Sequence, residues 1–150
     1  MYYSDMNDMA ADQAPSDNST ALFSVLHAAH ALEDKLEAAL GRAGLSTAKF
    51  SVLTELVKAR KPLALGELAS RVSCVRSNMT QLVDRLEADG FVRRVQCPTD
   101  RRSVNAEITE SGRVRQADAA VEVAKLNAEF AAQLGDEDRR AIESLARAIG

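Results

Sequence analysis

The sequence predicts a mainly α-helical fold with one small β-hairpin, and three observations support this fold class. Apolar residues recur every three or four positions through most of the 150 residues, as they do along one face of an amphipathic helix. Between residues 91 and 109 the period changes to two, which is typical of strands. The length is that of one domain with a single core, and because aromatic residues make up only 4% of the chain, we expect that core to be aliphatic.

Length and composition limit the classes of protein to consider. No apolar run approaches the roughly 20 residues that cross a bilayer, and residues 1–19 carry four acids and no base, unlike a targeting sequence. We therefore expect a cytoplasmic protein in which residues 1–19 form a disordered acidic tail. Two cysteines, Cys74 and Cys97, are too few to indicate a disulfide scaffold.

Two helices are predicted in the first part of the chain. A stripe of leucines, valines and alanines predicts a helix over about residues 20–41, where Gly41 and Gly44 can end it. Ser46 can cap a second helix, which must end before Pro62.

Two shorter helices follow. The segments LALGELASRVS and RSNMTQLVDRLEADG each place four apolar residues at positions i, i+3, i+4 and i+7. Gly90 supplies a C-terminal stop for the second of them. Two amphipathic helices joined by about four residues make a candidate helix-turn-helix.

The change of period predicts two strands, FVRRVQ and SVNAEIT, joined by a turn over residues 97–102. Thr109 or Ser111 can cap the next helix, which is expected over about residues 111–134 until Gly135 breaks it. The final segment, DEDRRAIESLARAIG, opens with three acids that suit a helix N-terminus.

The distribution of charge points to nucleic acid, although the net charge of −3 does not. Between Arg71 and Arg102 there are seven arginines against four acids, a net charge of +3, and the rest of the chain carries −6. A basic segment within an acidic frame is an electrostatic footprint of nucleic-acid binding that the whole-chain charge hides.

A helix-turn-helix followed by a hairpin with a basic tip is the element order of a winged helix. One helix can enter a major groove, and the hairpin beside it can reach a minor groove whose negative potential attracts arginine. We expect Arg101 and Arg102 to act there, and Asp100 to hold a guanidinium by a charge-assisted hydrogen bond.

On the second short helix, the apolar stripe leaves a polar outer face. Asn78 and Gln81 suit the adenine edge, whereas Ser77, Thr80 and Arg85 suit phosphate oxygens. Arg76 lies at the helix start and could contact either backbone or base. The predicted DNA-binding residues are therefore Arg76, Ser77, Asn78, Thr80, Gln81, Arg85, Asp100, Arg101 and Arg102.

Four motifs occur in order over about a third of the chain: ELA, LVDRLEADGFVRR, DRR and ITESG. This segment resembles the winged helix of MarR-type bacterial transcriptional regulators. The segments LSTAKFSVLTELVK and DEDRRAIESLARAI fit the same family, so the resemblance extends over residues 20–150.

The resemblance implies a symmetric homodimer that binds pseudo-palindromic double-stranded DNA, usually as a repressor. Residues 20–45 and 111–150 would form a helical dimerisation region, and residues 46–110 the winged helix-turn-helix that binds DNA. Many members of this family release DNA when a small phenolic or anionic effector binds between the two regions. We expect no metal and no other cofactor.

One departure from the family pattern concerns the start of the recognition helix. The family commonly has a Ser-Pro pair where this chain has Val75 and Arg76, so the cap shifts to Ser73 or Ser77 or is missing.

Other functions remain as alternatives. The fold could serve as a protein-interaction module without DNA, or a redox-responsive regulator could use Cys74, with Cys97 a weaker candidate. His27 and His30 lie one helical turn apart, but no further ligands complete a metal site. We expect no enzyme, because the chain lacks a phosphate-binding glycine loop and a nucleophile elbow.

Overall fold

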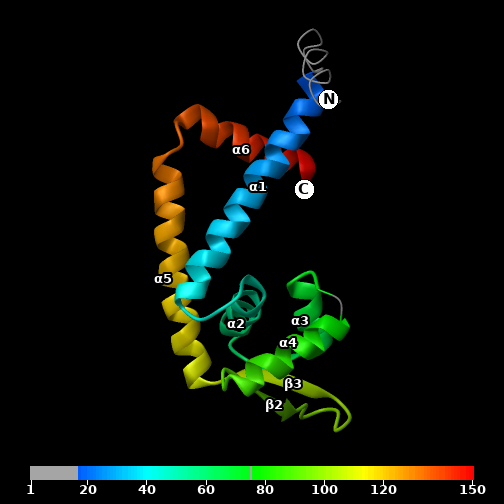
Figure 1. The fold of residues 1–150 in the computed structure, drawn as a ribbon. Coiled ribbons are helices and arrows are strands. Elements are labelled where there is room, and N and C mark those ends of the chain that lie inside the picture. Colours follow the sequence, from blue (N-terminus) through cyan, green and yellow to red (C-terminus); the bar gives the residue numbers. More distant parts are fainter. Residues whose placement is uncertain (1–16, 75) are drawn as a thin grey trace, which may run out of the picture. The chain divides into compact units, whose positions relative to one another are not determined.

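A computed structural model of the chain describes residues 17–74 and 76–150 (Figure 1). Within these ranges the elements are α1 (Asp17–Arg42), α2 (Thr47–Ala59), β1 (Leu63–Ala64), α3 (Leu65–Arg71), α4 (Arg76–Ala88), β2 (Val92–Gln96), β3 (Val104–Ile108), α5 (Glu110–Ala132) and α6 (Asp136–Ile149). The chain divides into two compact units, Met1–Asp34 and Lys35–Gly150. Most of the predicted acidic tail lies outside the described residues, but its last three residues belong to α1, which begins before Thr20.

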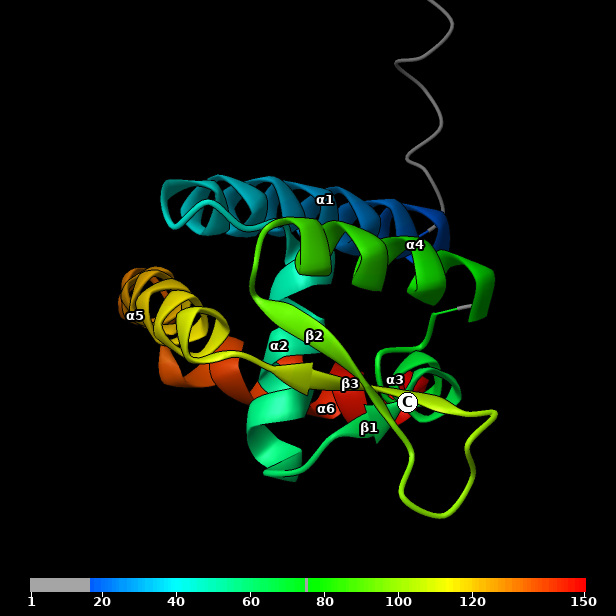
Figure 2. The same cartoon turned by 90° about the horizontal axis from the view of Figure 1, so that it is seen from below.

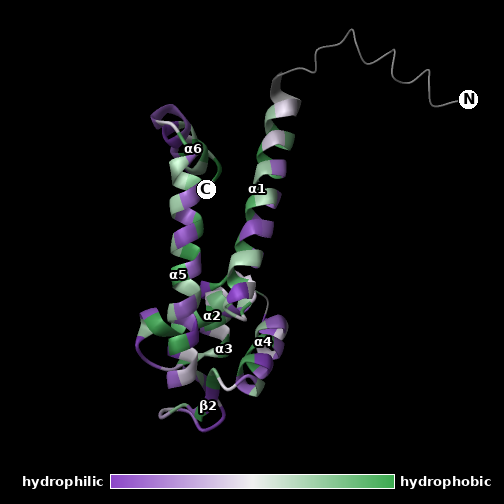
Figure 3. Cartoon of the chain, turned by 60° about the vertical axis from the view of Figure 1, so that its left-hand side comes forward, coloured by the Kyte–Doolittle hydropathy of each residue, from purple (hydrophilic) through white to green (hydrophobic). Residues whose placement is uncertain are grey.

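In the first unit, the described residues form the beginning of α1. The helix predicted over residues 20–41 is confirmed, and it continues through Gly41 to Arg42. Apolar residues recur along α1 (Figure 3), but most of those in the first unit are exposed. Phe23, for example, exposes 67% of its surface.

In the second unit, α2 lies at the centre of the core. Ser46 caps this helix as predicted, because its Oγ accepts a hydrogen bond from the Lys49 backbone N–H at 3.2 Å. The helix ends ahead of Pro62, also as predicted. Its buried residues are Val52, Leu53 and Leu56.

Helices α3 and α4 form the predicted helix-turn-helix pair. Between them, Ser73 has a φ of 52°, which turns the backbone through the left-handed region. Gly90, with a φ of 78°, follows the end of α4 as expected. The apolar stripe of α4 enters the core through Met79, Val83 and Leu86.

The third predicted helix begins two residues later than expected. Leu63 and Ala64 were expected to belong to that helix, but they form β1, and α3 begins only at Leu65. In the extended conformation the two residues pair with Ala106 and Asn105 of β3, so they join the edge of the sheet, and the Leu63 side chain is buried.

The predicted hairpin is confirmed and gains β1 as a third strand. The sheet is antiparallel with the order β1-β3-β2, and its register places Val92 opposite Ile108 and Arg94 opposite Ala106. Val92, Ala106 and Ile108 are buried on the face toward the helices. Alternation of side chains along each strand therefore separates a core face from a polar face, as the period of two predicted.

The start of α5 is held against the sheet and the end of α4. Of the two predicted candidates, Thr109 and Ser111, it is Thr109 that caps α5: its Oγ1 accepts from the Gly112 N–H at 3.0 Å and donates to the Gly90 carbonyl at 2.7 Å. Gly112 packs so closely that an added Cβ would lie 2.1 Å from the Phe91 carbonyl oxygen. The junction of wing and α5 thus depends on a residue without a side chain.

The last helix, α6, is amphipathic but has no buried residue. Its N-terminus begins with three acids as predicted, and the Asp138 carboxylate accepts a hydrogen bond from the Gly135 N–H at 2.8 Å. Along the described ranges, no helix is long and apolar enough to cross a membrane.

Candidate nucleic-acid interface

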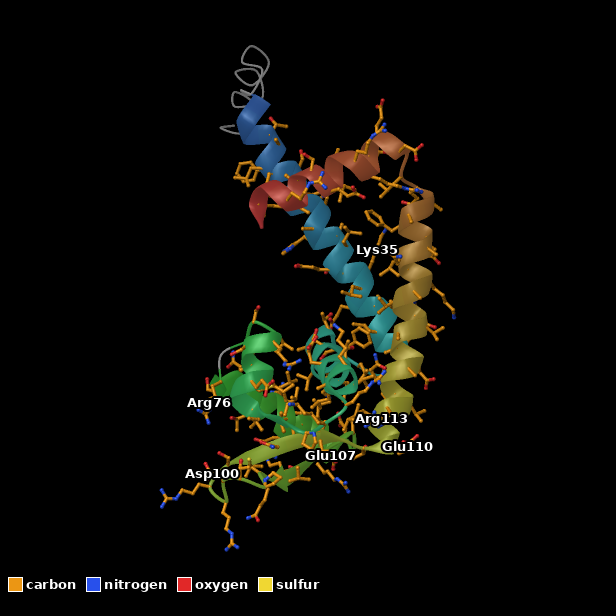
Figure 4. All side chains as sticks on the ribbon, turned by 180° about the vertical axis from the view of Figure 1, so that it is seen from behind. Lys35, Arg76, Asp100, Glu107, Glu110 and Arg113 are labelled. Carbon is orange, nitrogen blue, oxygen red and sulfur yellow. The ribbon has the colours of Figure 1, made fainter. Side chains whose placement is uncertain are left out.

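The candidate interface lies where α4 and the wing hairpin β2–β3 face the same side of the second unit. Figure 2 shows both elements in front when the unit is seen from below. Figure 4 places Arg76 at the start of α4 and Asp100 at the far end of the hairpin. The helix and the hairpin tip predicted to bind DNA are therefore available to one partner.

The outer face of α4 carries the predicted polar side chains. Arg76, Ser77, Asn78, Thr80, Gln81 and Arg85 are all exposed, whereas the stripe on the opposite face is buried. The Thr80 Oγ1 donates a hydrogen bond to the Arg76 carbonyl at 3.2 Å, so this hydroxyl can offer an outside partner only its acceptor capacity. Helix α4 begins at Arg76, and the residue before it lies outside the described residues, so the predicted shift of the cap stays a prediction.

A shallow groove of about 290 Å³ runs beside the recognition face of α4. Asn78, Gln81 and Arg85 line it from α4, and Ala48 lines it from the start of α2. Sequence reasoning missed Ala48, because nothing in a lone alanine indicates that its helix begins next to the polar face of another. Amide donors and acceptors and one guanidinium therefore converge on a single groove.

The wing tip is shaped by Asp100, although not through a guanidinium as predicted. The Asp100 carboxylate accepts hydrogen bonds from the Arg102 backbone N–H at 2.9 Å and from the Ser103 Oγ at 3.1 Å. These bonds close a local Asx-type turn. The side chains of Arg101 and Arg102 are exposed on this turn.

Ion pairs divide the seven arginines of the basic segment into two groups. Arg71 pairs with Glu67 and Glu55, Arg93 with Glu107, and Arg94 with Asp84 and Glu87. In contrast, no acid among the described residues forms an ion pair with Arg76, Arg85, Arg101 or Arg102. The uncompensated positive charge thus belongs to α4 and the wing tip, and sequence reasoning could not separate these four from the other three.

The two cysteines have different surroundings. Cys74 is half-buried, packs against the apolar core and lines the groove beside α4. Cys97 lies at the base of the wing tip, and its Sγ is 3.3 Å from the Thr99 Oγ1. Hydrogen bonding to Thr99 lowers the pKa of the Cys97 thiol. Cys74 therefore packs as a small apolar residue does.

A second hollow, of about 280 Å³, lies between α2 and the end of α3. Phe50 and Thr54 line it together with the charged residues Glu55, Lys58 and Arg71. The Glu55 carboxylate is 3.1 Å from the Lys58 Nζ and 3.6 Å from an Arg71 Nη. Sequence reasoning could not assemble this cleft, because its walls come from separate helices.

The two histidines, His27 and His30, lie one helical turn apart on α1. His30 Nδ1 is 3.4 Å from Glu33, and both side chains are largely exposed. Among the described residues there is no group of three metal-ligating side chains.

Known proteins match the part of the chain that carries the candidate interface. Residues 45–104 match the model of the MarR family. The chain is 32% identical over 98 residues to the HTH-type transcriptional regulator MhqR of Bacillus subtilis (strain 168), an alignment that covers 65% of this chain and 67% of MhqR. It is 42% identical over 69 residues to the uncharacterized HTH-type transcriptional regulator YkoM of the same organism, or 46% of this chain. That alignment spans only 44% of YkoM, and several other curated relatives are likewise matched over about half of their length.

Among solved structures, Sco3205 of Streptomyces coelicolor is similar throughout. This MarR family transcriptional regulator was crystallised in complex with DNA; it matches with a TM-score of 0.81 and 28% identity over 91% of both chains. The match confirms the predicted fold class, a mainly helical protein with a small β wing.

Proposed function

Because the chain belongs to the MarR family, we propose that it is a sequence-specific regulator of transcription that binds double-stranded DNA. The observation that carries this proposal is the location of the uncompensated arginines: all four lie on α4 or the wing tip, on one side of the unit. Sco3205, which shares the fold, is itself described in complex with DNA. A regulator of this kind would act in the cytoplasm, with the chromosome.

In this proposal α4 enters the major groove and the wing tip reaches the adjacent minor groove. Asn78 and Gln81 read base edges, because a side-chain amide matches the donor and acceptor of adenine. Ser77 and Arg85 contact phosphates, which fixes the register of the helix on DNA, and Arg76 contacts either backbone or base. Thr80 donates to a phosphate only when its hydroxyl turns away from the Arg76 carbonyl. Arg101 and Arg102 enter the minor groove, and Asp100 holds the turn that presents them.

The exposed apolar faces of α1 and α6 support a homodimer. A second copy would cover residues such as Phe23 and Leu145, which the described part of this chain leaves exposed. Two α4 helices related by a two-fold axis would then bind half-sites about 34–36 Å apart on one face of the duplex.

The cleft between α2 and α3 supports regulation by a small anionic or phenolic effector. An effector anion could compete with Glu55 for Lys58 and Arg71, while its apolar part packs against Phe50. Since α3 is the first helix of the helix-turn-helix pair, a ligand in this cleft could shift α4 and release DNA, as a repressor requires.

The proposal is tested by selecting duplexes from a random pool with the wild-type protein and measuring the affinity of the selected duplex at several salt concentrations. We expect a palindromic consensus and a steep loss of affinity with salt. Replacing Arg102 by Ala should weaken binding, whereas replacing Arg140 by Ala on α6 is the control and should have no effect. Gln81→Ala should relax preference at one base pair per half-site, by about 1–3 kcal/mol.

Failure to select any duplex would favour the alternative, a winged helix that binds another protein. An apolar protein contact would also show little dependence on salt, in contrast to a contact with several phosphates.

A further inference from the structure

Two neighbouring arginines of β2 have different partners. Arg93 and Arg94 lie on opposite faces of the sheet, as successive residues of a strand do. Arg93 pairs across the strands with Glu107 of β3. Arg94 instead pairs with two carboxylates of α4: one Nη contacts Asp84 and the other contacts Glu87. The Arg94 backbone N–H also donates to a Glu87 carboxylate oxygen at 3.3 Å.

We propose that Arg94 is a positioning residue that holds α4 and the wing hairpin at a fixed angle, so that both can enter adjacent grooves as one rigid body. The proposal rests on the proposed DNA binding. A planar guanidinium with five donors can satisfy two carboxylates at once, which a lysine cannot do with the same geometry. Asp84 and Glu87 are three residues apart on α4, so both lie on the side of the helix that faces β2.

The charges of α4 give an independent reason for this role. Asp84 and Glu87 are acids on the helix that would enter a groove between phosphates, where negative charge opposes binding. Arg94 offsets part of that charge and turns the two acids into anchor points for the wing. The presence of these acids is therefore explained by a structural link and not by contact with DNA.

Exposure separates Arg94 from its neighbour Arg93 and from the four arginines that we expect to touch DNA, all of which are exposed. Its side chain exposes 27% of its surface, whereas that of Arg93 exposes 66%. With its guanidinium engaged by two acids, Arg94 has little capacity for a phosphate. Although Arg94 lies in the basic segment of the sequence, it therefore acts on DNA binding through Asp84 and Glu87 and not by touching DNA.

A fixed angle matters because an unlinked wing would have to be ordered at each binding event. That ordering costs free energy at each binding event, whereas a preorganised wing is already ordered in the folded protein before DNA binds. Loss of Arg94 should therefore reduce affinity without removing a contact with DNA.

The test compares matched pairs of variants on the duplex selected by the wild-type protein. Arg94→Met removes the link, and Arg93→Met removes the same charge from the neighbouring position on the same strand. We expect Arg94→Met to weaken binding about tenfold, and Arg93→Met about threefold at most. Equal losses would overturn the proposal.

The acids give the sharpest contrast, because charge and rigidity predict opposite signs. Glu87→Gln removes a negative charge near DNA, so electrostatics alone predicts tighter binding. The link predicts weaker binding, by about threefold or more. Glu107→Gln, which removes the partner of Arg93, is the control and should follow electrostatics. Tighter binding by Glu87→Gln would contradict the role of Arg94.

Salt dependence and a conservative variant test whether Arg94 contacts a phosphate directly. If Arg94 bound a phosphate, Arg94→Met would reduce the slope of log K against log [salt] by about 0.9. We expect the slope to stay close to that of the wild type. Arg94→Lys keeps the charge but not the two-pronged contact, so it should remain impaired; full recovery would show that charge alone is needed.

A measurement without DNA separates failure of this inference from failure of the proposed function. Backbone amide exchange over residues 92–108 should be faster in Arg94→Met and Glu87→Gln than in Arg93→Met, because the hairpin loses its attachment to α4. If the wild-type protein selects no duplex, the proposed function fails, and this comparison still decides the link. Equal exchange in all three variants would overturn it.

Discussion

Helices α4 and α6 have similar lengths and each carries an apolar stripe, but the two apolar faces have different surroundings. In α4, the side chains of Met79, Val83 and Leu86 are fully buried. In α6, Ile142, Leu145 and Ile149 expose 43%, 39% and 73% of their surface. An apolar stripe thus predicts that a helix face will be covered, but it does not say whether the same chain supplies the cover. The apolar face of α4 is buried within the winged helix of the same chain. We propose that the apolar face of α6 is buried by a second copy.

The largest expected effect is in the core of the winged helix. Leu86→Ala should lower the free energy of unfolding by about 2–5 kcal/mol, because it leaves a cavity in a closely packed core. Leu145→Ala on α6 removes the same atoms from a side chain that is partly exposed within one copy, so its effect should be smaller and should depend on protein concentration. Denaturant unfolding at several protein concentrations measures both, and equal losses would mean that the two faces do not differ as described.

The next effect concerns assembly. Leu145→Asp, or Leu32→Asp on α1, would place a charge in the proposed dimer core and should weaken association by about 2–3 kcal/mol, or 30- to 150-fold. Mass in solution, measured by light scattering over a range of concentrations, would then fall from dimer to monomer. The control on α6 is Arg140→Asp, which replaces a side chain that is already charged, and it should leave the mass unchanged. Dimers that persist in the Leu145 variant would remove α6 from the interface.

A smaller effect tests the close packing where the wing meets α5. Gly112→Ala should destabilise the fold by about 1–3 kcal/mol, because the new Cβ would overlap the Phe91 carbonyl oxygen. Gly41→Ala is the matched control: nothing lies within 4 Å of its added Cβ, and it should stabilise helix α1 by about 0.5–1 kcal/mol. Thermal unfolding of both variants checks the opposite signs.

The smallest effect depends on pH and concerns the connection between α1 and α2. Hydrogen bonds from the Thr47 side chain and backbone N–H lower the pKa of the Glu37 carboxyl. A lowered pKa in the folded state means that the carboxylate stabilises the fold above its unfolded pKa of about 4.3, and that this contribution is lost as the pH falls through the folded pKa.

Glu37→Gln should therefore be less stable than the wild type at pH 7, by less than about 1 kcal/mol because the group is exposed to solvent. The two proteins should become equally stable in acid. Denaturant unfolding from pH 7 to pH 3 gives the comparison, and a difference that stays constant with pH would exclude Glu37 as its source.

Much of the fold could be predicted from neighbouring residues. Ser46 and Thr109 were recognised as caps because a cap acts on an N–H only three residues away. The strand β1 was missed, because two residues are too few to show a periodic pattern. Leu63 belongs to a strand only because it pairs with Ala106 of β3. The same limit applies to Asp100, whose carboxylate binds a backbone N–H instead of the predicted guanidinium.

By itself, the sequence determined the order of the helices and strands, the caps, and the polar face of α4, since each follows from side chains within one or two turns of one another. Tertiary structure decided which arginines stay uncompensated, which stripe is covered, and how the wing is joined to α4. Arg93 and Arg94 are neighbours of the same residue type. They have different partners only because successive side chains of β2 point to opposite faces, one toward α4 and the other toward Glu107 of β3. Ion pairs and burial are properties of surfaces brought together by folding, and neighbouring residues alone do not specify them.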